Sequence, residues 1–451
     1  MSAEALARRI CATLRAQGFD AYLVGGCVRD LLLGRAPEDF DVATSAGPDQ
    51  IVALFPHSGQ VGAHFGVVLV RDENAQVEVA TFRSDHSYSD GRRPDRVEFE
   101  TDPRQDVLRR DFTINALLLD PSSGEVLDFT GGRADLAGGV IRAIGDPEAR
   151  FREDRLRLLR AVRFAARLGF VIESHTAGAI HRLRALAHNV AAERVRDELV
   201  RILTEGGARR GFELLDRLGL LTEILPEVAA MKGVAQPPEF HPEGDVWTHT
   251  LLLLEALDKP SATLALGALL HDVGKPPTYR LAERIRFDGH AELGARMAVE
   301  ILNRLRFSSD EVRRVEALVA QHLRFMDVPR MRESTLKRFL RLEHFDEHFE
   351  LHRLDCLASH RRLDTYELVR ARLASLTEEQ LKPPPLITGD DLIAAGYRPG
   401  PAFGTMLAAV EDAQLESRIM TREEALALVR EGFEPPEGRP RTGETQTPST
   451  E

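Results

Sequence analysis

The sequence has little that would suit it to an oxidising or a membrane environment. It contains three cysteines in 451 residues, and none of them is spaced from another as in a zinc or redox motif. No apolar run approaches the roughly 20 residues that a membrane-spanning helix needs, and the first residues show no apolar core of a secretion signal. We therefore expect a reduced, cytoplasmic protein without a membrane partner.

Positive charge is also in deficit. Acidic residues outnumber Lys and Arg by 71 to 59, which gives a formal net charge of −12. A chain with this charge is a poor non-specific ligand for nucleic acid or anionic lipid. If it binds a polyanion, it must do so through a local basic surface. At 43% hydrophobic residues the chain can fill cores, and its length suggests about three domains.

The chain begins as a mixed α/β segment and continues as a helical one. Short β-rich runs separated by Gly, Asp and Pro occur between residues 20 and 145, whereas almost every segment after residue 150 has helical periodicity. The expected fold class is therefore α+β, with an N-terminal mixed α/β head followed by an elongated all-α body. Prolines that cannot continue a helix mark the boundaries, and a Pro-, Gly- and Thr-rich composition marks the tail. We expect domains at residues 1–147, 148–236, 237–382 and 383–433, and a disordered tail at 434–451.

Short motifs in the head carry groups that suit phosphate and metal chemistry. Gly25 and Gly26 follow an expected strand and precede a helix, so that backbone amides can approach a phosphate closely. Asp39 and Asp41 alternate along the next strand and would share one face, about 7 Å apart at Cα. Two carboxylates so placed repel each other unless a hard cation such as Mg²⁺ lies between them. Taken singly, each motif also occurs as an ordinary turn or polar strand face.

A third motif brings two arginines and an aspartate together. Arg109, Arg110 and Asp111 precede another apolar run. The fork of an arginine can engage phosphate oxygens bidentately, which suits a triphosphate, and an aspartate beside it can accept a hydrogen bond from a ribose 2′-hydroxyl. In isolation, a solvated charged turn explains the same residues.

Arginine is concentrated on one face of the helix expected at residues 153–168. Arg157, Arg160, Arg163 and Arg167 fall within an arc of about 120°, opposite an apolar stripe. We interpret this face as the local basic surface that the net charge requires, because arginine without lysine indicates planar or bidentate recognition. An ordinary solvated helix face is the alternative.

Near the start of that helix, Asp154 and Arg157 lie one turn apart and offer an acceptor beside a donor. Cytosine and adenine each present an exocyclic amine donor beside a ring-nitrogen acceptor, whereas uracil and guanine present the reverse order. A protein pair of this kind would accept C and A and leave polar groups unpaired against U and G. Two side chains would then replace a nucleic-acid template.

Taken together, these motifs resemble those of the class II tRNA nucleotidyltransferase and poly(A) polymerase family. The resemblance covers residues 20 to 210 and depends on four segments in the order and spacing of the family: Gly25–Asp30, Glu38–Thr44, Arg109–Leu117 and Glu153–Phe164. It implies a nucleotidyltransferase-type head that acts on RNA.

The resemblance also implies roles for particular residues. Asp39 and Asp41 would be catalytic and would bind Mg²⁺. Glu78 alternates along a later strand like a third acidic position of the wider superfamily. The implied nucleotide-binding residues are Gly26, Arg29, Arg110, Asp111, Asp154, Arg157, Arg160 and Arg163.

A second group of metal-binding residue types lies in the helical body. His271 and Asp272 follow an apolar helix, with His249 before them and Asp355 at a distance after them. Over residues 245–356 this pattern resembles the HD metal-dependent phosphohydrolases. The resemblance implies an HD-type helical domain with these four residues as metal ligands. A retained but idle site is the alternative.

Other histidines of the body are further candidates. His290 and His322 lie between the dyad and the distant aspartate and would serve a second metal. Imidazole and carboxylate ligands together suit Mn²⁺, Ni²⁺ or Fe. His344, His348 and His352 recur every four residues on one helical face, which we interpret as solvated rather than metal-binding.

The most consistent reading is template-independent addition of C, C and A to the 3′ end of tRNA from CTP and ATP, with Mg²⁺ in the head and an additional phosphohydrolase activity in the body. One alternative is an enzyme that adds A alone, or a poly(A) polymerase. Another is an HD phosphohydrolase whose N-terminal half only binds RNA. A polar stretch at residues 84–91 is expected to be a mobile loop. In the family that the sequence resembles, a loop at this place accompanies addition of the final A, so the resemblance argues against an enzyme that adds only C. The sequence leaves the oligomeric state open.

Overall fold

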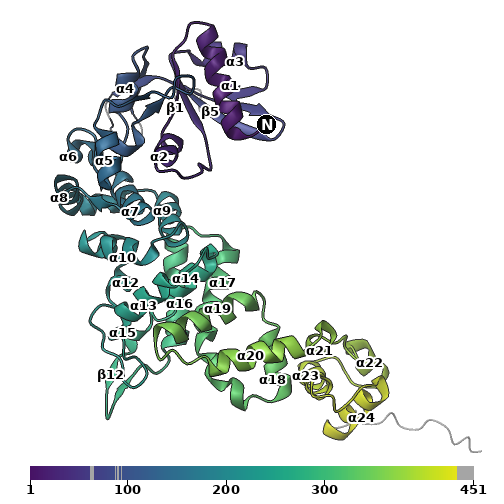
Figure 1. Ribbon diagram of the computed structural model, residues 1–451. Coiled ribbons are helices and arrows are strands. Elements are labelled where there is room, and N and C mark those ends of the chain that lie inside the picture. Colours follow the sequence, from purple (N-terminus) through teal and green to yellow (C-terminus); the bar gives the residue numbers. More distant parts are fainter. Residues whose placement is uncertain (61–65, 87, 89–90, 93, 434–451) are drawn as a thin grey trace, which may run out of the picture. The chain divides into compact units, whose positions relative to one another are not determined.

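The structure, a computed structural model, describes residues 1–60, 66–86, 88, 91–92 and 94–433 (Figure 1). It divides into two compact units, one formed by residues 1–320 with 358–360 and the other by residues 321–357 with those from 361 onward. The α+β class is confirmed, with a mixed sheet in the head and helices after it. No helix of the described segments is both long enough and apolar enough to cross a membrane. The predicted tail, residues 434–451, lies outside the described residues.

A seven-stranded sheet forms the centre of the head, with strand order β3-β4-β5-β2-β1-β8-β9. β2 and β5 are parallel, and the other neighbours are antiparallel. The strands are β1 (Ala21–Val24), β2 (Asp41–Thr44), β3 (Ser58–Gln60), β4 (Val67–Asp72), β5 (Ala75–Thr81), β8 (Leu118–Leu119) and β9 (Val126–Leu127). Alternation of β-branched residues explains β5, where Val77 and Val79 are buried and Glu78 between them is exposed. Period-2 patterning thus sends one face of the strand into the core and presents Glu78 on the other.

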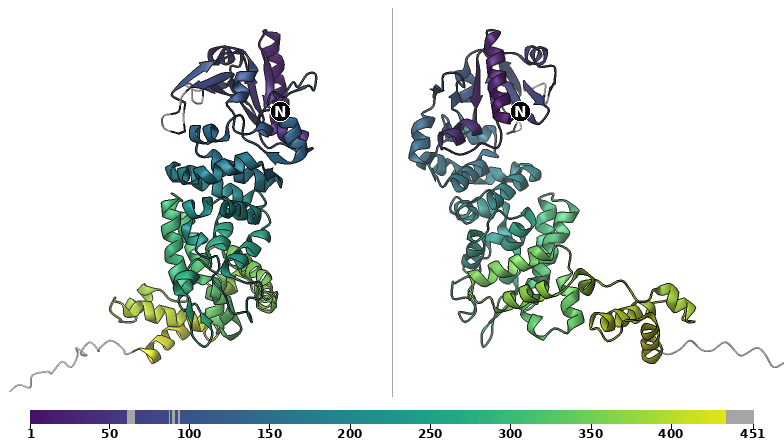
Figure 2. Two further views of the ribbon diagram at one scale, coloured as in Figure 1. Left: turned by 90° about the vertical axis from the view of Figure 1, so that its left-hand side faces the viewer. Right: turned by 45° about the vertical axis from the view of Figure 1, so that its right-hand side comes forward.

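Helices α1 (Ala3–Ala16) and α3 (Pro48–Leu54) pack on the sheet (Figures 1 and 2). In α1, Leu6, Ile10 and Leu14 are buried at intervals of one helical turn, as expected for an amphipathic helix. Helix α2 (Gly26–Leu32) follows β1 directly and therefore begins at the end of the strand. The remaining elements of the head are β6 (Arg83–His86), β7 (Arg96–Phe99), α4 (Pro103–Leu108), η2 (Thr113–Asn115), α5 (Gly132–Gly138) and β10 (Val140–Ile141).

The stretch at 84–91, expected to be a loop, begins as a strand instead. Residues 83–86 form β6 and pair antiparallel with β7 in register Arg83↔Phe99. The backbone on both sides of this pair is already fixed by the sheet, because Phe82 donates to the Thr44 carbonyl and accepts from the Glu100 amide. Polar composition alone did not reveal this pairing. Residues 87, 89 and 90 of the stretch lie outside the described residues.

The helix expected at residues 153–168 is two helices, α6 (Pro147–Glu153) and α7 (Arg157–Leu168). Asp154 breaks them apart: its backbone is extended, with φ −135° and ψ 104°, and its Oδ1 accepts a hydrogen bond from the Leu156 amide at 3.1 Å. An aspartate that binds the backbone two residues ahead competes with continuous helix. This break carries Asp154 out of the helical face on which the sequence pattern placed it.

The helical body of the first unit continues from the neck. Its elements are β11 (Val171–Ile172), α8 (Ser174–Leu183), η3 (Arg184–Asn189), α9 (Ala192–Thr204), α10 (Ala208–Arg217), α11 (Leu220–Ile224), α12 (Pro226–Ala229), α13 (Val246–Glu255), α14 (Ala262–Leu270), α15 (Lys275–Thr278), β12 (Arg280–Leu281), β13 (Ile285–Arg286), α16 (His290–Arg304) and α17 (Ser309–Gln321). Helix α14 is buried along its whole length, which explains its continuous apolar sequence.

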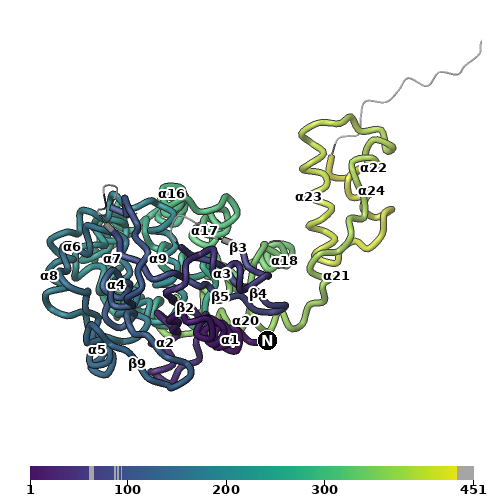
Figure 3. Tube along the Cα trace, turned by 90° about the horizontal axis from the view of Figure 1, so that it is seen from above, coloured from purple at the N-terminus to yellow at the C-terminus, as the bar shows by residue number. Residues whose placement is uncertain are grey.

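The second unit is entirely helical over its described residues. Its elements are η4 (His322–Arg330), α18 (Glu333–Leu340), α19 (Phe345–Ala358), α20 (Asp364–Ser375), α21 (Glu378–Leu381), α22 (Gly389–Ala394), α23 (Ala402–Leu415) and α24 (Arg422–Gly432). Helices α22, α23 and α24 pack together around one small core (Figure 3). Thr388 caps α22 as its sequence indicates, and Asp391 completes the capping box by accepting from the Thr388 amide.

Candidate functional site

A pocket of about 390 Å³ lies beside the start of α2 and β2 and is closed on its other side by α7 and α9. It is lined by Gly25, Gly26, Arg29, Asp41, Arg109, Arg110, Asp111, Asn115, Asp154, Arg157, Arg160, Phe164 and Arg194. The structure thus brings together most of the predicted head and neck residues, and those that do not line the pocket are Asp39, Glu78, Arg163 and Arg167. Segments more than 150 residues apart in the chain, such as Gly25 and Arg194, border the same space.

An acidic cluster forms at one edge of this pocket, where two parallel strands run side by side. Asp41 at the start of β2 lies directly opposite Glu78 on β5, and Asp39 is exposed just before β2. Burial, together with the negative charges of Glu78 and Asp39, raises the pKa of Asp41 to about 6, although Arg110 opposes the shift. Carboxylates held this close disfavour their own ionisation unless a cation joins them. The donor set therefore fits a hard divalent ion such as Mg²⁺.

Gly25 keeps the space in front of this cluster open. Its φ of +79° lies in the left-handed region, and a Cβ on it would lie 3.7 Å from Asp41 Oδ2 and 3.6 Å from Arg110 Nη1. A larger side chain would be strained at this φ and would stand between the carboxylate and the guanidinium. Gly25 thus leaves room for a bound group to approach both the Arg110 guanidinium and the Asp41 carboxylate.

The two adjacent arginines of the head share an acid that the sequence analysis did not single out. Arg109 Nη2 donates to Asp106 Oδ1 at 2.5 Å, and Arg110 Nη2 donates to Asp106 Oδ2 at 2.8 Å. Burial opposes ionisation of Asp106, but the two guanidiniums outweigh it and hold its pKa below the ordinary value. The spacing of three and four residues was the available signal, since side chains so spaced meet on a helix. Asp106 therefore fixes the orientation of both guanidinium groups.

Asp111 joins the head to the neck. Its Oδ2 accepts from Arg160 Nε and Nη2 at 2.8 and 2.6 Å, and its Oδ1 accepts from the Asn115 amide at 3.2 Å. Burial opposes ionisation of this carboxyl, but Arg160 and Arg157 hold its pKa at about 2. Asn115 in turn accepts from Arg29 at 2.9 Å. A continuous chain of polar contacts thus links two predicted nucleotide-binding arginines from different segments.

Asp154 and Arg157, predicted to offer an acceptor and a donor to a base, each have other partners in the structure. Asp154 forms two hydrogen bonds of 3.0 Å with Arg194 of α9, a residue that the sequence analysis missed. Arg157 donates instead to Glu153 at 2.8 Å and to the backbone carbonyls of Arg109 and Arg150. The break between α6 and α7 is the physical reason, because it turns Asp154 toward α9. All three polar side chains still border the pocket.

The prediction of an open basic face on α7 is wrong for Arg157 and Arg163, which are 9% and 4% exposed. Arg163 pairs with Glu198 of α9 at 2.8 Å and lies outside the pocket lining, whereas Arg167 pairs with Glu205 at 3.2 Å. Glutamates from a helix that is distant in sequence thus neutralise much of the arginine stripe. Of the four arginines predicted on this face, all within the described residues, only Arg160 both lines the pocket and is partly exposed.

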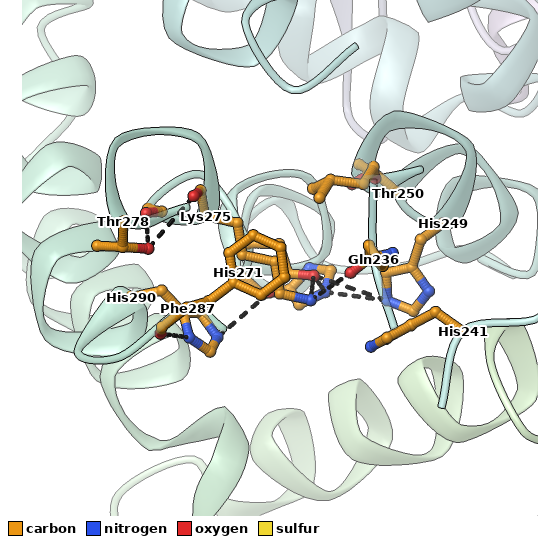
Figure 4. A network of polar contacts seen from close by, with 12 residues as sticks. Gln236, His241, His249, Thr250, His271, Lys275, Thr278, Phe287 and His290 are labelled. Carbon is orange, nitrogen blue, oxygen red and sulfur yellow. Dashed lines mark hydrogen bonds and ion pairs between the residues drawn. The ribbon is translucent and has the colours of Figure 1, made fainter. Parts of the chain in front are cut away.

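The second cluster lies in the body, where His249 on α13 and His271 after α14 face each other (Figure 4). Their Nε2 atoms are 3.3 Å apart, and Asp272 Oδ2 lies 3.2 Å from His271 Nε2 and 3.9 Å from His249 Nε2. His290 Nε2 lies 3.5 Å from the other carboxylate oxygen of Asp272. All four side chains are buried. One carboxylate and three imidazole nitrogens thus converge in a space that excludes bulk water.

The partners on the far side of each ring determine what the converging nitrogens offer. His271 Nδ1 contacts the Ala268 carbonyl at 2.9 Å, and His290 Nδ1 contacts the Phe287 carbonyl at 2.8 Å. A carbonyl can only accept, so both Nδ1 atoms carry a proton, and in the neutral form of each ring Nε2 carries a lone pair. Lone pairs directed at one another repel unless a cation lies between them. The arrangement fits a metal ion of the kind that imidazole binds.

Glu243 and Lys275 complete this cluster, and the sequence analysis had singled out neither of them. Glu243 Oε1 accepts from His249 Nδ1 at 2.7 Å, which leaves His249 Nε2 as a further lone pair, and it also contacts His241 Nδ1 at 2.9 Å. The Lys275 ammonium lies 2.7 Å from Asp272 Oδ2. Burial opposes ionisation of Asp272, but His271 and Lys275 hold its pKa well below the usual range. The spacing of three residues to Asp272 was the signal for Lys275.

Two predicted ligands of the body, His322 and Asp355, belong to the second compact unit, on η4 and α19. Their role in the metal site stays a prediction. The interpretation of the four-residue histidine repeat as a solvated face is wrong in part, because His348 and His352 are buried and His344 is exposed. His352 stacks on Phe325 with ring centroids 4.3 Å apart. Aromatic packing, which the repeat itself does not indicate, buries this face.

A sheet that presents Asp41, with Glu78 beside it, to an arginine-lined pocket, followed by a helical domain with a buried His-Asp dyad, defines a nucleotidyltransferase-type head joined to an HD domain. Comparison with known families confirms this class. Residues 21–142 match the poly A polymerase head domain, residues 169–232 match a probable RNA and SrmB-binding site of polymerase A, and residues 245–355 match the HD domain. The chain thus carries the three domains of the family predicted from its sequence.

Individual relatives bear the name CCA-adding enzyme. That of Enterococcus faecalis is 41% identical over 257 residues, covering 56% of this chain and 62% of the relative, and that of Lactiplantibacillus plantarum is 47% identical over 197 residues, covering 44% and 48%. The chain therefore matches about half to three fifths of the length of these relatives. The solved structure of the Bacillus stearothermophilus CCA-adding enzyme in complex with CTP is similar to the whole fold, with a TM-score of 0.73, 28% identity, and coverage of 94% of this chain and 96% of that one.

The raised pKa of Asp41 predicts how Mg²⁺ should stabilise the protein. Its carboxyl titrates near 6 when folded and near 3.8 when unfolded, so its ionisation weakens the metal-free fold as the pH rises between these values, on the order of 2–3 kcal/mol in all. Mg²⁺ requires the ionised form and must displace a proton below pH 6. We expect Mg²⁺ to raise the Tm more at pH 7.5 than at pH 5.0, measured by calorimetry. The difference should vanish in Asp41→Asn, and an equal shift at both pH values in the unaltered protein would contradict the assignment.

Proposed function

We propose that this protein adds C, C and A to the 3′ end of tRNA, using CTP and ATP and no nucleic-acid template. The observation that carries the proposal is one pocket that brings three groups of side chains together. Asp41 of the acidic cluster lines it, Asp154 and Arg194 offer polar groups to a base, and further arginines line the same space. The names of the relatives, and the CTP bound to the similar solved structure, support it.

The proposal extends to domain limits and location. We place the head at residues 1–147, the neck at 148–236, the HD-type domain at 237–382 and the C-terminal helices at 383–433. We also place the protein in the cytoplasm. All three cysteines are free and buried, which suits a reducing compartment.

Asp39 and Asp41 would hold Mg²⁺, with Glu78 as a third carboxylate within reach. When bound, Mg²⁺ supplies activation of the RNA 3′-hydroxyl and neutralisation of the charge on the leaving pyrophosphate. The chain itself supplies positions: Gly25 leaves room for the phosphates, and Arg110 is aimed at them by Asp106. Guanidiniums that are already oriented need no rearrangement as charge develops. We assign no protein general base.

Base selection would depend, as predicted from the sequence, on the hydrogen-bond donor and acceptor along one edge of the base. The structure adds one requirement. Because Asp154 is held by Arg194, an incoming exocyclic amine must share or replace those hydrogen bonds. Arg157 must likewise exchange its bond to Glu153 for one to the base. A base that cannot satisfy both groups leaves them desolvated and unpaired, which penalises U and G.

The proposal is tested by extending tRNA that ends at the discriminator base, or at CC, with CTP, ATP or both, and sizing the products to the nucleotide. We expect two additions with CTP alone on the first substrate, three with both nucleotides, and one with ATP on the second. Asp41→Asn should abolish every addition while tRNA affinity stays within a few-fold, because the basic residues of the pocket remain. Asp49→Asn, an exposed acid of the same domain, is the matched control. Addition of A alone would replace the proposal by its first alternative.

Selection of C over U should depend on Asp154 and Arg157. Replacing both with alanine removes two directed polar contacts, and we expect discrimination between CTP and UTP to fall by about 1–3 kcal/mol per lost contact. The measurement is the ratio of kcat/KM for the two nucleotides on one tRNA substrate. If UTP is still rejected as strongly by the double variant, the base is read elsewhere in the pocket.

A second activity is favoured by the converging imidazoles of the body. We propose that His249, His271, Asp272 and Asp355 hold Mn²⁺ or Ni²⁺, with His290 and His322 serving a second ion, in a site that hydrolyses phosphate monoesters or 2′,3′-cyclic phosphates. Such ions supply Lewis acidity toward the phosphoryl group. In the reaction a water oxygen bonds to phosphorus, the bond from phosphorus to a ribose oxygen breaks, and a proton of the water ends on that ribose oxygen. Clearing a damaged RNA end in this way would prepare it for nucleotide addition.

The two sites should fail separately. His271→Ala combined with Asp272→Ala should abolish hydrolysis of 2′,3′-cyclic nucleotide and retain CCA addition, whereas Asp41→Asn should do the reverse, because the sites share no ligand. Assays with Mg²⁺, Mn²⁺ and Ni²⁺ in turn, together with metal analysis of the purified protein, identify the ion. If no substrate is hydrolysed with any of these ions and no metal beyond that of the head is bound, the hydrolase proposal fails.

A further inference from the structure

A short β-hairpin is inserted between two segments of the histidine cluster in the body. It consists of β12 and β13, with Arg280 opposite Arg286 and Leu281 opposite Ile285. The chain enters it from Lys275 and α15 and leaves it toward His290 at the start of α16. Both ends of the hairpin are therefore anchored at residues of the candidate metal site.

The base of the hairpin is in direct contact with that site. The rings of Tyr279 and Phe287 lie 5.9 Å apart, and Phe287 packs edge-on against the ring of His290 at 6.3 Å. The Lys275 ammonium lies 5.4 Å from the centre of the Phe287 ring, and Figure 4 shows these side chains converging. A molecule held along the hairpin would therefore have its end next to the buried histidines.

Strand alternation separates the hairpin into two faces of different chemistry. Tyr279, Leu281, Ile285 and Phe287 share one face, on which Leu281 is 74% exposed and Tyr279 is 40% exposed. The facing arginines share the other. The hairpin thus carries cations on one face and exposed aromatic and aliphatic side chains on the other, and these are the two kinds of side chain with which proteins bind the phosphates and the bases of single-stranded nucleic acid.

The arginines of the hairpin destabilise the pairing of its two strands. Arg280 and Arg286 are exposed and directly opposed, and like charges in this register destabilise a strand pair. Arg284 in the turn adds a third cation. Within the part of the chain that the structure describes, none of the three forms an ion pair with a carboxylate.

Acidic residues near the hairpin do not cancel this charge. Glu283 lies in the turn and Asp288 lies after β13, and both are exposed. A two-stranded hairpin this short is marginally stable by its own contacts. A repulsion retained in such an element points to a ligand that relieves it, and the ligand must be an extended anion because the three arginines are spread along the hairpin.

We propose that the β12–β13 hairpin is an RNA-binding arm of the HD site. It holds the last phosphates of a single-stranded RNA on Arg280, Arg284 and Arg286, so that the terminal phosphate reaches the histidine cluster. The placement of the RNA end rests on the proposed phosphohydrolase function. The arm makes a damaged RNA end, rather than a free mononucleotide, the preferred substrate of that site.

The test compares the unaltered protein with Arg280→Ala/Arg286→Ala, in binding a labelled five-nucleotide RNA that ends in a 3′-phosphate. We expect the Kd at 0.1 M salt to rise about tenfold or more, and the slope of log affinity against log salt to shrink by about 1.4, because two phosphate contacts of a single strand are lost. Arg280→Lys/Arg286→Lys should retain most of the affinity. Arg296→Ala/Arg313→Ala removes the same charge from exposed positions of α16 and α17 and should leave binding unchanged.

Hydrolysis supplies the second readout. The alanine pair should raise KM for the same RNA ending in a 2′,3′-cyclic phosphate, and leave both hydrolysis of 2′,3′-cyclic AMP and CCA addition unchanged. Three results would contradict the proposed RNA-binding arm. They are unchanged RNA affinity in the alanine pair, an equal loss of RNA affinity in the α16 and α17 control, and equally tight, arginine-dependent binding of a poly-glutamate peptide. If the unaltered protein hydrolyses neither substrate but its RNA affinity still depends on the hairpin, the phosphohydrolase proposal fails and the binding arm stands.

Discussion

The ion pair between Asp111 and Arg160 is the contact on which the head and neck depend. It joins a segment of the head to α7 through two hydrogen bonds of 2.8 and 2.6 Å, in which Asp111 is buried and Arg160 is partly exposed. Around it, Phe112 packs edge-on against Phe164 at 5.8 Å, and the Arg29 guanidinium lies 5.3 Å from the same ring. Removing one partner of a buried pair leaves the other charge uncompensated, which is strongly destabilising. The geometry of the pocket is therefore tied to the integrity of the interface that forms it.

One physical theme recurs in both candidate sites. Asp41 is held against Glu78 by strand pairing, and the Nε2 atoms of His249 and His271 are held against each other by partners behind the rings. In each case the fold enforces a juxtaposition that is unfavourable by itself. Such strain is retained where a ligand relieves it, because the energy lost in the free protein is regained on binding. The opposed arginines of the β12–β13 hairpin are another unfavourable juxtaposition of this kind, in this case between two positive charges.

Neutralisation explains how an acidic chain can still present an anion site. Two arginines of α7, Arg163 and Arg167, are neutralised by Glu198 of α9 and by Glu205 at the end of that helix. These ion pairs neutralise positive charge that the sequence pattern had indicated as a basic surface for RNA. The pocket retains a small set of guanidiniums held in place by buried acids, as Asp106 holds Arg110. Orientation, rather than the amount of positive charge, distinguishes the pocket.

The sequence by itself determined the class of fold, and it predicted the two candidate sites and most of the residues that the structure brings together in them. Strand alternation around Asp41 and the spacing of His271 and Asp272 are local patterns, and local patterns can be read from spacing. Which side chains meet was decided by tertiary structure. Arg194 reaches Asp154 because the chain breaks between α6 and α7, and Glu243 reaches His249 through a loop with no periodicity. Such contacts depend on how distant segments pack, and neither composition nor periodicity encodes that in a form that one sequence reveals.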